Sequence, residues 1–503
     1  MTASTAARGD AFAASRQGFE SLVSWLSGNA TTDLTHAELE THLQHKGREL
    51  LRQLTQDHLD LRAHREQRLH EVTDATGVGR PCVEGGHQRA LTTVFGEVTV
   101  TRLAYRARGH SNLHPADARL NLPVEKHSHG LRKLAAVEAS RGSFDGAIEA
   151  IERATGLRLG KRQVEDLAAA AAVDFDTFYE QRRPPQGTGC DDVLALSADG
   201  KGIVMHRNAL RPATAKAAAT STTKLATRLS KGEKRNRKRM AEVGAVFDVT
   251  PALRTPADIL PSPHTTDDTD RPDPPATTNK WLTASVIDDA ATVIGQVFDE
   301  ADRRDPSHQR TWVALVDGNN HQINRIHAEA AARDIDIDIL CDFVHVLEYL
   351  WKAAWSFHHE GDPAAEQWVH DKARAVLEGK ARHVAAGIRR SATRRGLGPP
   401  KRAGPDTCAD YLLNKAPYLD YPRALAAGWP IATGVIEGAC RHLVKDRMDL
   451  TGARWGLPGA EAILKLRALN SNDDLDAYWR HHLAQERHRV HESRYLNGIP
   501  QAA

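Results

Sequence analysis

The sequence predicts a mixed α/β protein, and three observations support this fold class. Two short apolar runs, VLALSADG (193–200) and WVALVDG (312–318), are typical of buried β-strands, and each ends in Asp-Gly. Residues with helical periodicity surround these runs and dominate residues 346–430. Period-two alternation marks an earlier pair of strands. We therefore expect a mixed β-sheet flanked by helices, with an all-helical insertion, preceded by a helical and β-hairpin N-terminal region.

Bulk composition excludes several classes of protein. At 503 residues the chain has room for about three domains. No segment approaches the roughly 20 apolar residues of a membrane span, and the N-terminus lacks the pattern of a secretory signal, so we expect no membrane partner. The 5 cysteines include no CxxC pair, which favours neither a disulfide framework nor a zinc ribbon and indicates a cytoplasmic location. The net charge is only +2, so any nucleic-acid contact must come from local basic patches.

The N-terminal region combines helices with a hairpin. Residues 31–75 have helical spacing, and Thr35 with Glu38 fits a capping box. Their leucines serve either core packing or self-association. Residues 90–106 alternate around Gly96-Glu97, which predicts a β-hairpin.

Residues 144–173 are typical of two helices joined by a tight turn, with Gly156 at the end of the first helix. The second helix opens with Lys161 and Arg162, at the end that a DNA-reading helix-turn-helix inserts into the major groove. The alternative is an ordinary helical hairpin without a DNA contact.

From residue 191 the pattern is mixed α/β. Asp192–Asp199 predicts a strand with Gly202–His206 as its hairpin partner, and 216–242 predicts a basic helix. Further strands are expected at 279–287, 312–316 and 335–340, with a linker at 250–279, a helix ending near 304, a helix after Gly434, and a helical tail over 476–494.

Three acidic residues stand out in this part. Asp199 and Asp317 end the two apolar strands, where the alternative is a simple turn. Glu437 lies beside the apolar stripe of its helix, which is formed by Ile436, Cys440, Leu443 and Val444. Magnesium takes oxygen ligands, and two such ions about 4 Å apart can hold both oxygens of a phosphoryl transfer. Two strand-end aspartates and a helical glutamate are suited to that role.

Four stretches carry a family resemblance: ADGKG around Asp199, WVALVDGNNHQ around Asp317, DFVHVLEYLWKAAW (342–355) and GVIEGACRHLVKDRMDLTGARW (434–455). They resemble the catalytic segments of bacterial insertion-sequence DDE transposases of the ISKra group, which is related to Mutator-like transposases. With the hairpin and the helical pair, the resemblance covers most of residues 85–495. It implies an RNase H-like catalytic core.

The resemblance implies that Asp199, Asp317 and Glu437 form the DDE triad and bind two Mg²⁺ or Mn²⁺ ions. The intervals between these acids are 118 residues (317 − 199) and 120 residues (437 − 317). The second interval is longer than a minimal RNase H core needs, and the additional residues match the helical insertion of the related group. That group also has a C/D-x-x-H signature, matched here by Asp342 and His345. This pair acts either near the scissile phosphate or as a structural anchor for the insertion.

Basic residues near the acids are candidates for DNA contact, because lysine and arginine bind the phosphates of DNA whatever its base sequence. A solvated surface is the ordinary alternative for the basic run that contains residues 231–239, and core packing is the alternative for Trp455. The tail (480–494) is a weaker candidate. The candidates are Lys231, Lys234, Arg235, Arg237, Lys238 and Arg239 in the basic run, and Arg441, Arg447, Arg454 and Trp455 after Glu437.

The expected function is therefore DNA transposition: metal-dependent hydrolysis at transposon ends, then strand transfer into target DNA. The expected partners are double-stranded DNA, as terminal inverted repeats and target, and further copies of the chain in a homodimer or larger assembly. The expected location is cytoplasmic and nucleoid-associated. The alternatives are another RNase H-like nuclease and a domesticated DNA-binding protein that does not transpose.

The sequence divides into seven expected regions. They are an N-terminal helical region (1–80), a β-hairpin subdomain (81–125), a helix-turn-helix-like DNA-binding region (126–185), the first part of the RNase H-like core (186–345), the helical insertion (346–430), the final core helix (431–475) and a basic helical tail (476–503).

Overall fold

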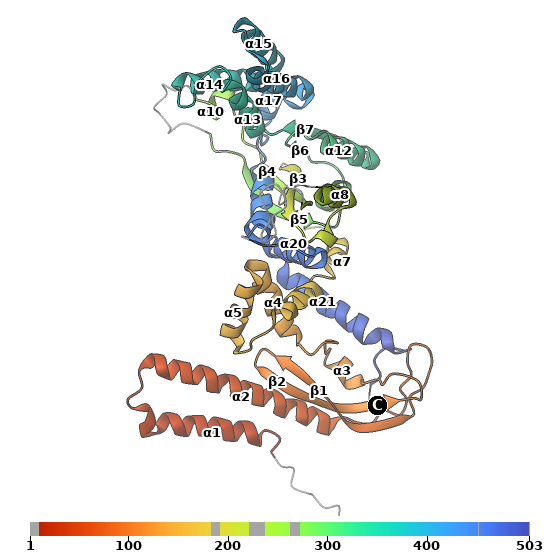
Figure 1. The fold of residues 1–503 in the computed structure, drawn as a ribbon. Helices are drawn as coiled ribbons and strands as arrows, with labels where there is room; N and C mark the ends of the chain where they lie inside the picture. Colours follow the sequence, from red (N-terminus) through yellow and green to blue (C-terminus); the bar gives the residue numbers. More distant parts are fainter. Residues whose placement is uncertain (1–9, 183–191, 221–236, 262–271, 451, 502–503) are drawn as a thin grey trace, which may run out of the picture. The chain divides into compact units, whose positions relative to one another are not determined.

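The computed structural model describes residues 10–182, 192–220, 237–261, 272–450 and 452–501 (Figure 1). Contacts group the chain into two compact units. Unit 1 consists of residues 1–181 together with 473–503, and unit 2 consists of residues 182–472. The seven-region division is finer than this grouping and stays a prediction.

Unit 1 contains the predicted helices and hairpin. Its helix α2 begins with the predicted capping box between Thr35 and Glu38, but it ends at Arg65, short of residue 75. Gly156 takes a left-handed conformation (φ 74°) at the end of α5, as the predicted turn requires. The elements are α1 (Ala13–Ser27), α2 (His36–Arg65), β1 (Cys82–Thr93), β2 (Gly96–Arg106), α3 (Pro115–Arg119), α4 (His129–Arg141), α5 (Phe144–Thr155), α6 (Lys161–Ala171), α7 (Phe175–Glu180) and α21 (Leu475–Val490).

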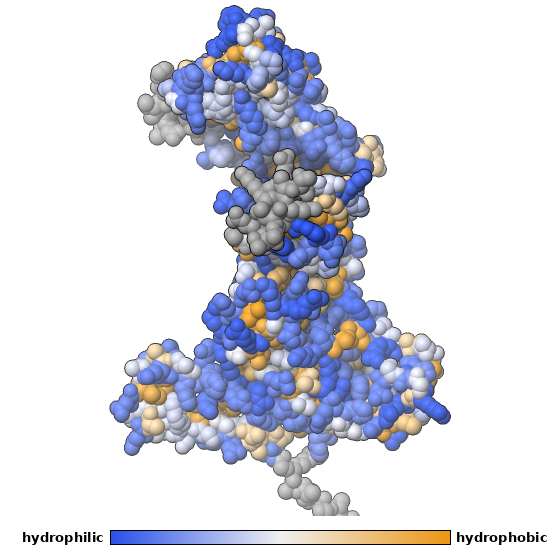
Figure 2. Space-filling model, in the orientation of Figure 1, coloured by the Kyte–Doolittle hydropathy of each residue, from blue (hydrophilic) through white to orange (hydrophobic). Residues whose placement is uncertain are grey.

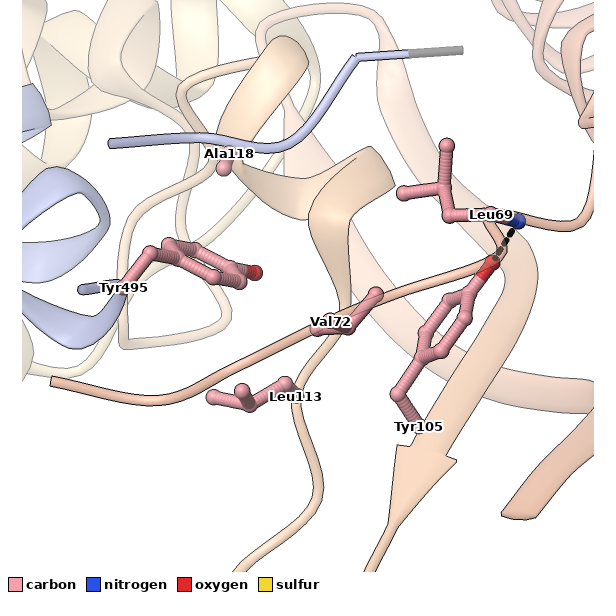
Figure 3. Packing of buried hydrophobic residues seen from close by; sticks show 6 residues of the cluster. All are labelled: Leu69, Val72, Tyr105, Leu113, Ala118 and Tyr495. Carbon is pink, nitrogen blue, oxygen red and sulfur yellow. Dashed lines mark hydrogen bonds between the residues drawn. The ribbon is translucent and has the colours of Figure 1, made fainter. Parts of the chain in front are cut away.

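The C-terminal segment completes the core of unit 1. Tyr495 packs in a cluster with residues from 69 to 118 (Figure 3), and it also pairs with Asp74 in a β-bridge. In the same cluster the Leu69 N–H donates to the Tyr105 hydroxyl at 2.8 Å. The hairpin of β1 and β2 is antiparallel, which confirms the predicted hairpin. Its turn lies at Val94 and Phe95, two residues before the predicted Gly96-Glu97, because Gly96 is already paired with Thr93 as the first residue of β2.

Unit 2 has a five-stranded mixed sheet in the order β5-β4-β3-β6-β7. Strand β4 runs antiparallel to both neighbours, whereas β3, β6 and β7 are parallel. Counted along the chain this order is 3-2-1-4-5, which is compatible with an RNase H-like core. The strands are β3 (Val193–Val204), β4 (Lys238–Thr250), β5 (Ala276–Ser285), β6 (Trp312–Val316) and β7 (Ile337–Cys341).

Helices flank this sheet. Helix α11 (Ala290–Arg304) approaches β4 so closely at Gly244 that a Cβ there would lie 2.5 Å from Val297. Apolar side chains of α18 and η4 face β3 and β4. Outside the predicted insertion, the other helices of unit 2 include α8 (Pro212–Thr220), α10 (Pro256–Ile259), α12 (Asn320–Arg333), α18 (Gly434–Ala439), the π-helical η4 (Cys440–Lys445), α19 (Asp446–Met448) and α20 (Leu457–Ser471).

The predicted insertion is helical, and its helices gather in one group beyond the sheet in Figure 1. They are α13 (Phe343–Ala354), α14 (Pro363–Leu377), α15 (Ala381–Arg394), α16 (Pro399–Asn414) and α17 (Tyr421–Ala426). Among the described residues, no helix of either unit is both long and apolar enough to cross a membrane.

Two local predictions in unit 2 are wrong. Residues 202–204 do not fold back as a hairpin partner, because β3 continues through Asp199 and Gly200 to Val204 and pairs with β4 instead. The predicted basic helix over 216–242 is also wrong at its end, since residues 238–242 form the start of β4. Residues 221–236 lie outside the described part of the chain.

Candidate active site

The candidate site lies where β6 and β7 end and where β3 continues beyond its parallel pairing with β6. Strands β3 and β6 pair from Leu194 with Trp312 to Ser197 with Leu315, a constant difference of 118 (315 − 197). Asp199 and Asp317 are also 118 residues apart (317 − 199), so each lies two residues beyond this last pair, at the same level along the strands. Ligand sites form outside the carboxyl ends of such strands.

A third aspartate joins this row. Strands β6 and β7 pair up to Val316 with Cys341, so the next position of each strand is Asp317 and Asp342. The Asp342 N–H donates to the Val316 carbonyl at 2.8 Å, which extends the ladder to this level. Adjacent strands lie about 4.8 Å apart, so the three aspartates form a row across the carboxyl ends of the parallel pairings.

Asp199 and Asp317 are both partly buried and held by their own backbone. Gly200 N–H donates to Asp199 Oδ1 at 2.6 Å, and Asn319 N–H donates to Asp317 Oδ1 at 2.7 Å. The other Asp199 oxygen, Oδ2, accepts from the Cys440 thiol at 3.3 Å. Because Cys440 is one helical turn after Glu437, this contact links the end of β3 to the glutamate helix.

Asp342 is fully buried at the start of α13. Its Oδ1 accepts from the Val344 N–H at 2.8 Å, and its Oδ2 accepts from the Thr433 hydroxyl at 2.5 Å. His345 Nδ1 lies 3.6 Å from the same Oδ2, beyond hydrogen-bond reach, and it has no other partner among the described residues. Burial acts to raise the pKa of Asp342, but its interactions with His345, Thr433 and Val344 outweigh burial and hold the pKa below its usual value.

Glu437 completes the cluster from helix α18. Thr433 Oγ1 lies 3.5 Å from Glu437 Oε1, so one hydroxyl contacts both acids. Burial and the negative charge of Asp342 raise the pKa of Glu437, whereas the Asp342 carboxylate raises the pKa of His345. A cluster that perturbs its own members in this way is a functional-site candidate.

Asp342, His345 and Glu437 form the one group among the described residues whose ligand atoms all lie within 4.8 Å of one another. Two carboxylates and one imidazole suit a divalent cation, and the buried His345 Nδ1 without a hydrogen bond fits a ligand role. Asp199 and Asp317 lie outside this tight group, although they lie at the same end of the parallel strands as Asp342. The predicted triad with Glu437 therefore stays a prediction.

Sequence reasoning missed three residues here. Thr433 contacts two of the acids, and the Tyr411 hydroxyl donates to the Asp317 carbonyl at 3.2 Å. Glu242 pairs with Gly200 across β3 and β4, and its pKa is raised by burial and by the nearby Asp199. The alternation of Ala241, Val243 and Ala245 was the one available signal for β4.

The structure places the predicted DNA-binding residues in different surroundings. Lys161 and Arg162 are exposed in the first turn of α6, where Lys161 Nζ lies 2.9 Å from Asp145 and Arg162 Nε lies 3.3 Å from Asp166. Arg441 and Arg454 are exposed as well.

The basic run is described only in part. Lys231, Lys234 and Arg235 lie outside the described residues. Lys238 is exposed at the start of β4, whereas Arg237 is buried. Arg239 donates to the carbonyls of Val286 and Ala209 at 2.7 and 3.3 Å, so its guanidinium is held by backbone.

Trp455 and Arg447 are interior residues. Trp455 is 5% exposed, and its indole N–H donates to the Met448 carbonyl at 3.0 Å. The Arg447 guanidinium covers the Trp455 ring at 4.7 Å, and burial lowers the pKa of Arg447 to about 10. The structure thus shows the packing alternative for Trp455, because its ring is not accessible to an unpaired base.

Comparisons with known proteins give little further guidance. No family model matches the chain, and no curated protein matches it. Among solved structures, the chain is similar to the Drosophila P element transposase strand transfer complex, with 8% sequence identity and a TM-score of 0.20 over 70% of this chain and 79% of that chain. At that TM-score the two chains do not share a demonstrated fold, so the side chains of the site carry the proposal below.

Proposed function

We propose that this chain is a metal-dependent DNA transposase that cleaves phosphodiester bonds at transposon ends and joins the freed ends to target DNA. The observation that carries the proposal is the row of Asp199, Asp317 and Asp342 on three adjacent strands, with Glu437 and His345 grouped around Asp342. Such a concentration of carboxylates is unfavourable without cations, and divalent ions with phosphate ligands compensate it.

The proposed triad comes from the family resemblance, and the addition of Asp342 and His345 rests on their grouping with Glu437. Asp199, Asp317 and Glu437 hold two Mg²⁺ or Mn²⁺ ions, and Asp342 with His345 extends the ion-binding set. Bound ions supply a polarised phosphoryl group and a nucleophile of lowered pKa. Thr433 fixes the two acids it contacts, and the backbone N–H groups of Gly200 and Asn319 orient the strand-end carboxylates.

The remaining parts of the proposal concern partners. The helix pair α5 and α6 presents Lys161 and Arg162 for contact with terminal inverted repeats. Pairing two DNA ends requires more than one active site, so we propose a homodimer or larger assembly on DNA, acting in the cytoplasm at the nucleoid.

Asp199→Asn provides the direct test. Purified protein is incubated with Mg²⁺ and DNA carrying the inverted repeats that flank its own gene, and both cleavage and joining are measured. We expect the variant to lose both while DNA binding persists, because asparagine retains an oxygen for the Gly200 N–H but no charge. Asp336→Asn is the matched control, since Asp336 is exposed just before the amino end of β7, at the end of the strand away from the site. Full activity of Asp199→Asn would overturn the assignment.

The same assay separates the alternatives. Cleavage without joining would indicate another RNase H-like nuclease. Binding without either reaction in the wild-type protein would indicate a DNA-binding protein that does not transpose.

A further inference from the structure

The helical insertion carries an unusual charge distribution. Residues 379–405 contain eight lysines and arginines and no aspartate or glutamate, whereas the whole chain has 67 basic and 65 acidic residues. A segment of a nearly balanced chain that excludes one sign over this length has a strongly positive local field. Helix α15 lies at the centre of this segment.

Helix α15 separates its apolar and basic residues by face. Ala381, Val384, Ala385, Ile388 and Ala392 are buried against the rest of the insertion. The exposed side carries Arg382, Arg390 and Arg394, which we call the arginine stripe. With about 1.5 Å of rise per residue, the stripe is roughly 18 Å long. Figure 2 shows a mostly hydrophilic surface over α15, at the top of the view.

Most of the basic neighbours of the stripe have partners. Lys380 pairs with Glu378, Arg389 with Asp410, and Arg402 with Asp406. Arg395 covers the Phe357 ring and donates to its carbonyl. Within the described parts of the chain, by contrast, no hydrogen bond or ion pair engages a side chain of the stripe.

We propose that the arginine stripe binds the phosphate backbone of duplex DNA. Duplex DNA carries one negative charge per about 1.7 Å of axis, so a stripe of this length faces roughly ten charges. Arginine matches phosphate geometry with its planar guanidinium, and the exposed stripe needs no rearrangement to reach it. The proposal rests on the proposed function only for the choice of DNA as the polyanion.

Salt dependence of binding tests the stripe directly. Binding of a 30-base-pair duplex of arbitrary sequence is measured by fluorescence anisotropy over a range of salt concentrations. For Arg382→Gln/Arg390→Gln/Arg394→Gln we expect the slope of log Kobs against log salt to become shallower by about 2 to 3, since each phosphate contact contributes about 0.9. The triple Arg→Lys variant should keep the wild-type slope, because phosphate contact depends on charge.

A matched control removes three paired cations. Lys380→Gln/Arg389→Gln/Arg402→Gln changes the net charge equally but removes cations that already have carboxylate partners, so the slope should change by less than about one. Thermal melting checks each triple variant, and the single Gln variants serve if a triple variant fails to fold, each making the slope shallower by about 0.9.

The outcomes separate this proposal from the proposed function. An unchanged slope in the stripe variant, or equal losses in the Gln and Lys triples, overturns the stripe even if the protein transposes DNA. The proposed DNA contact would also be overturned if the stripe substitutions weakened binding of poly-glutamate and not of duplex DNA. That result would favour an acidic protein partner. A shallower slope in a protein without cleavage activity would support the stripe and refute the transposase.

Discussion

Each unit contains a buried aspartate beside a histidine, and the two pairs differ in their surroundings. In unit 1, His482 Nδ1 lies 2.7 Å from Asp174 Oδ2, and Arg489 donates two hydrogen bonds to the same carboxylate. In unit 2, His345 Nδ1 lies 3.6 Å from Asp342 Oδ2, and a second carboxylate, Glu437, lies within 4.8 Å of both.

The pKa shifts follow this difference. Burial, together with the nearby Arg132, lowers the pKa of His482, whereas Asp342 raises the pKa of His345. The first pair has its charge balanced by guanidinium groups and serves the fold. The second has an excess of negative charge, which a bound cation would balance. Under the proposed function, similar residue pairs thus serve stability in one unit and chemistry in the other.

Of four further changes, removing Asp342 should have the largest effect. Asp342→Asn keeps an oxygen for the Val344 N–H but removes the charge of the buried acid, so we expect Mg²⁺-dependent cleavage to fall by about 10²- to 10³-fold. Initial rates of DNA cleavage measure this, with Asp336→Asn as the control. Wild-type rates in Asp342→Asn would place the chemistry elsewhere on the sheet edge.

Removing the corresponding aspartate of unit 1 should instead affect stability. Asp174→Asn leaves His482 and Arg489 without their carboxylate, at a cost of about 3 kcal/mol to the free energy of unfolding of unit 1. Hydrogen exchange measured by mass spectrometry should show faster exchange in α7 and α21, with unit 2 unchanged. Equal protection in both proteins would show that the pair contributes nothing to the fold.

Acid should destabilise unit 1 in particular. Burial lowers the pKa of His129 to about 4, and it also lowers the pKa of His127, His482 and His491. Between about pH 6.5 and 4 the unfolded chain therefore binds more protons than the folded one, so stability falls as pH falls. For His129 alone the loss is on the order of 2 kcal/mol at pH 5.

Hydrogen exchange of each unit at several pH values measures this loss. His129→Gln should flatten the pH dependence of unit 1 between pH 6.5 and 5. A profile identical to that of the wild type would show that His129 titrates normally in the folded protein.

Thr433 should have the smallest effect of the four. Thr433→Val removes the hydroxyl that contacts Asp342 and Glu437, and we expect Mn²⁺ affinity to fall about tenfold. The loss stays modest because the Val344 N–H still holds Asp342 Oδ1. Titration calorimetry with Mn²⁺ measures it, and Thr433→Ser should restore most of the affinity. Equal affinities in the Val and Ser variants would remove the positioning role.

The sequence predicted much of this architecture from local patterns. The capping box at Thr35, the turn at Gly156 and the strand before Asp317 depend on residues close in the chain, and all three are confirmed. Asp199-Gly200 was misleading, because β3 stays paired with β4 through these residues, which otherwise favour turns. The start of β4 was hidden in a basic run that resembles a solvated helix.

The candidate site was less predictable. Asp199 and Asp317 follow obvious apolar strands, so their place at a sheet edge could be anticipated. The position of Asp342 beside them depends on the register of β7, which no local pattern fixes. Thr433 contacts an acid 91 residues away in sequence, and that pairing comes only from tertiary packing.

The discontinuity of unit 1 also determines when it can fold. Its last elements, including His482 and Tyr495, are translated only after the whole of unit 2, since unit 1 resumes at residue 473. A ribosome therefore releases the complete sheet of unit 2 before the N-terminal helices obtain their final partners. A premature stop codon after residue 472 would yield a chain with every candidate catalytic acid and an unfinished N-terminal unit.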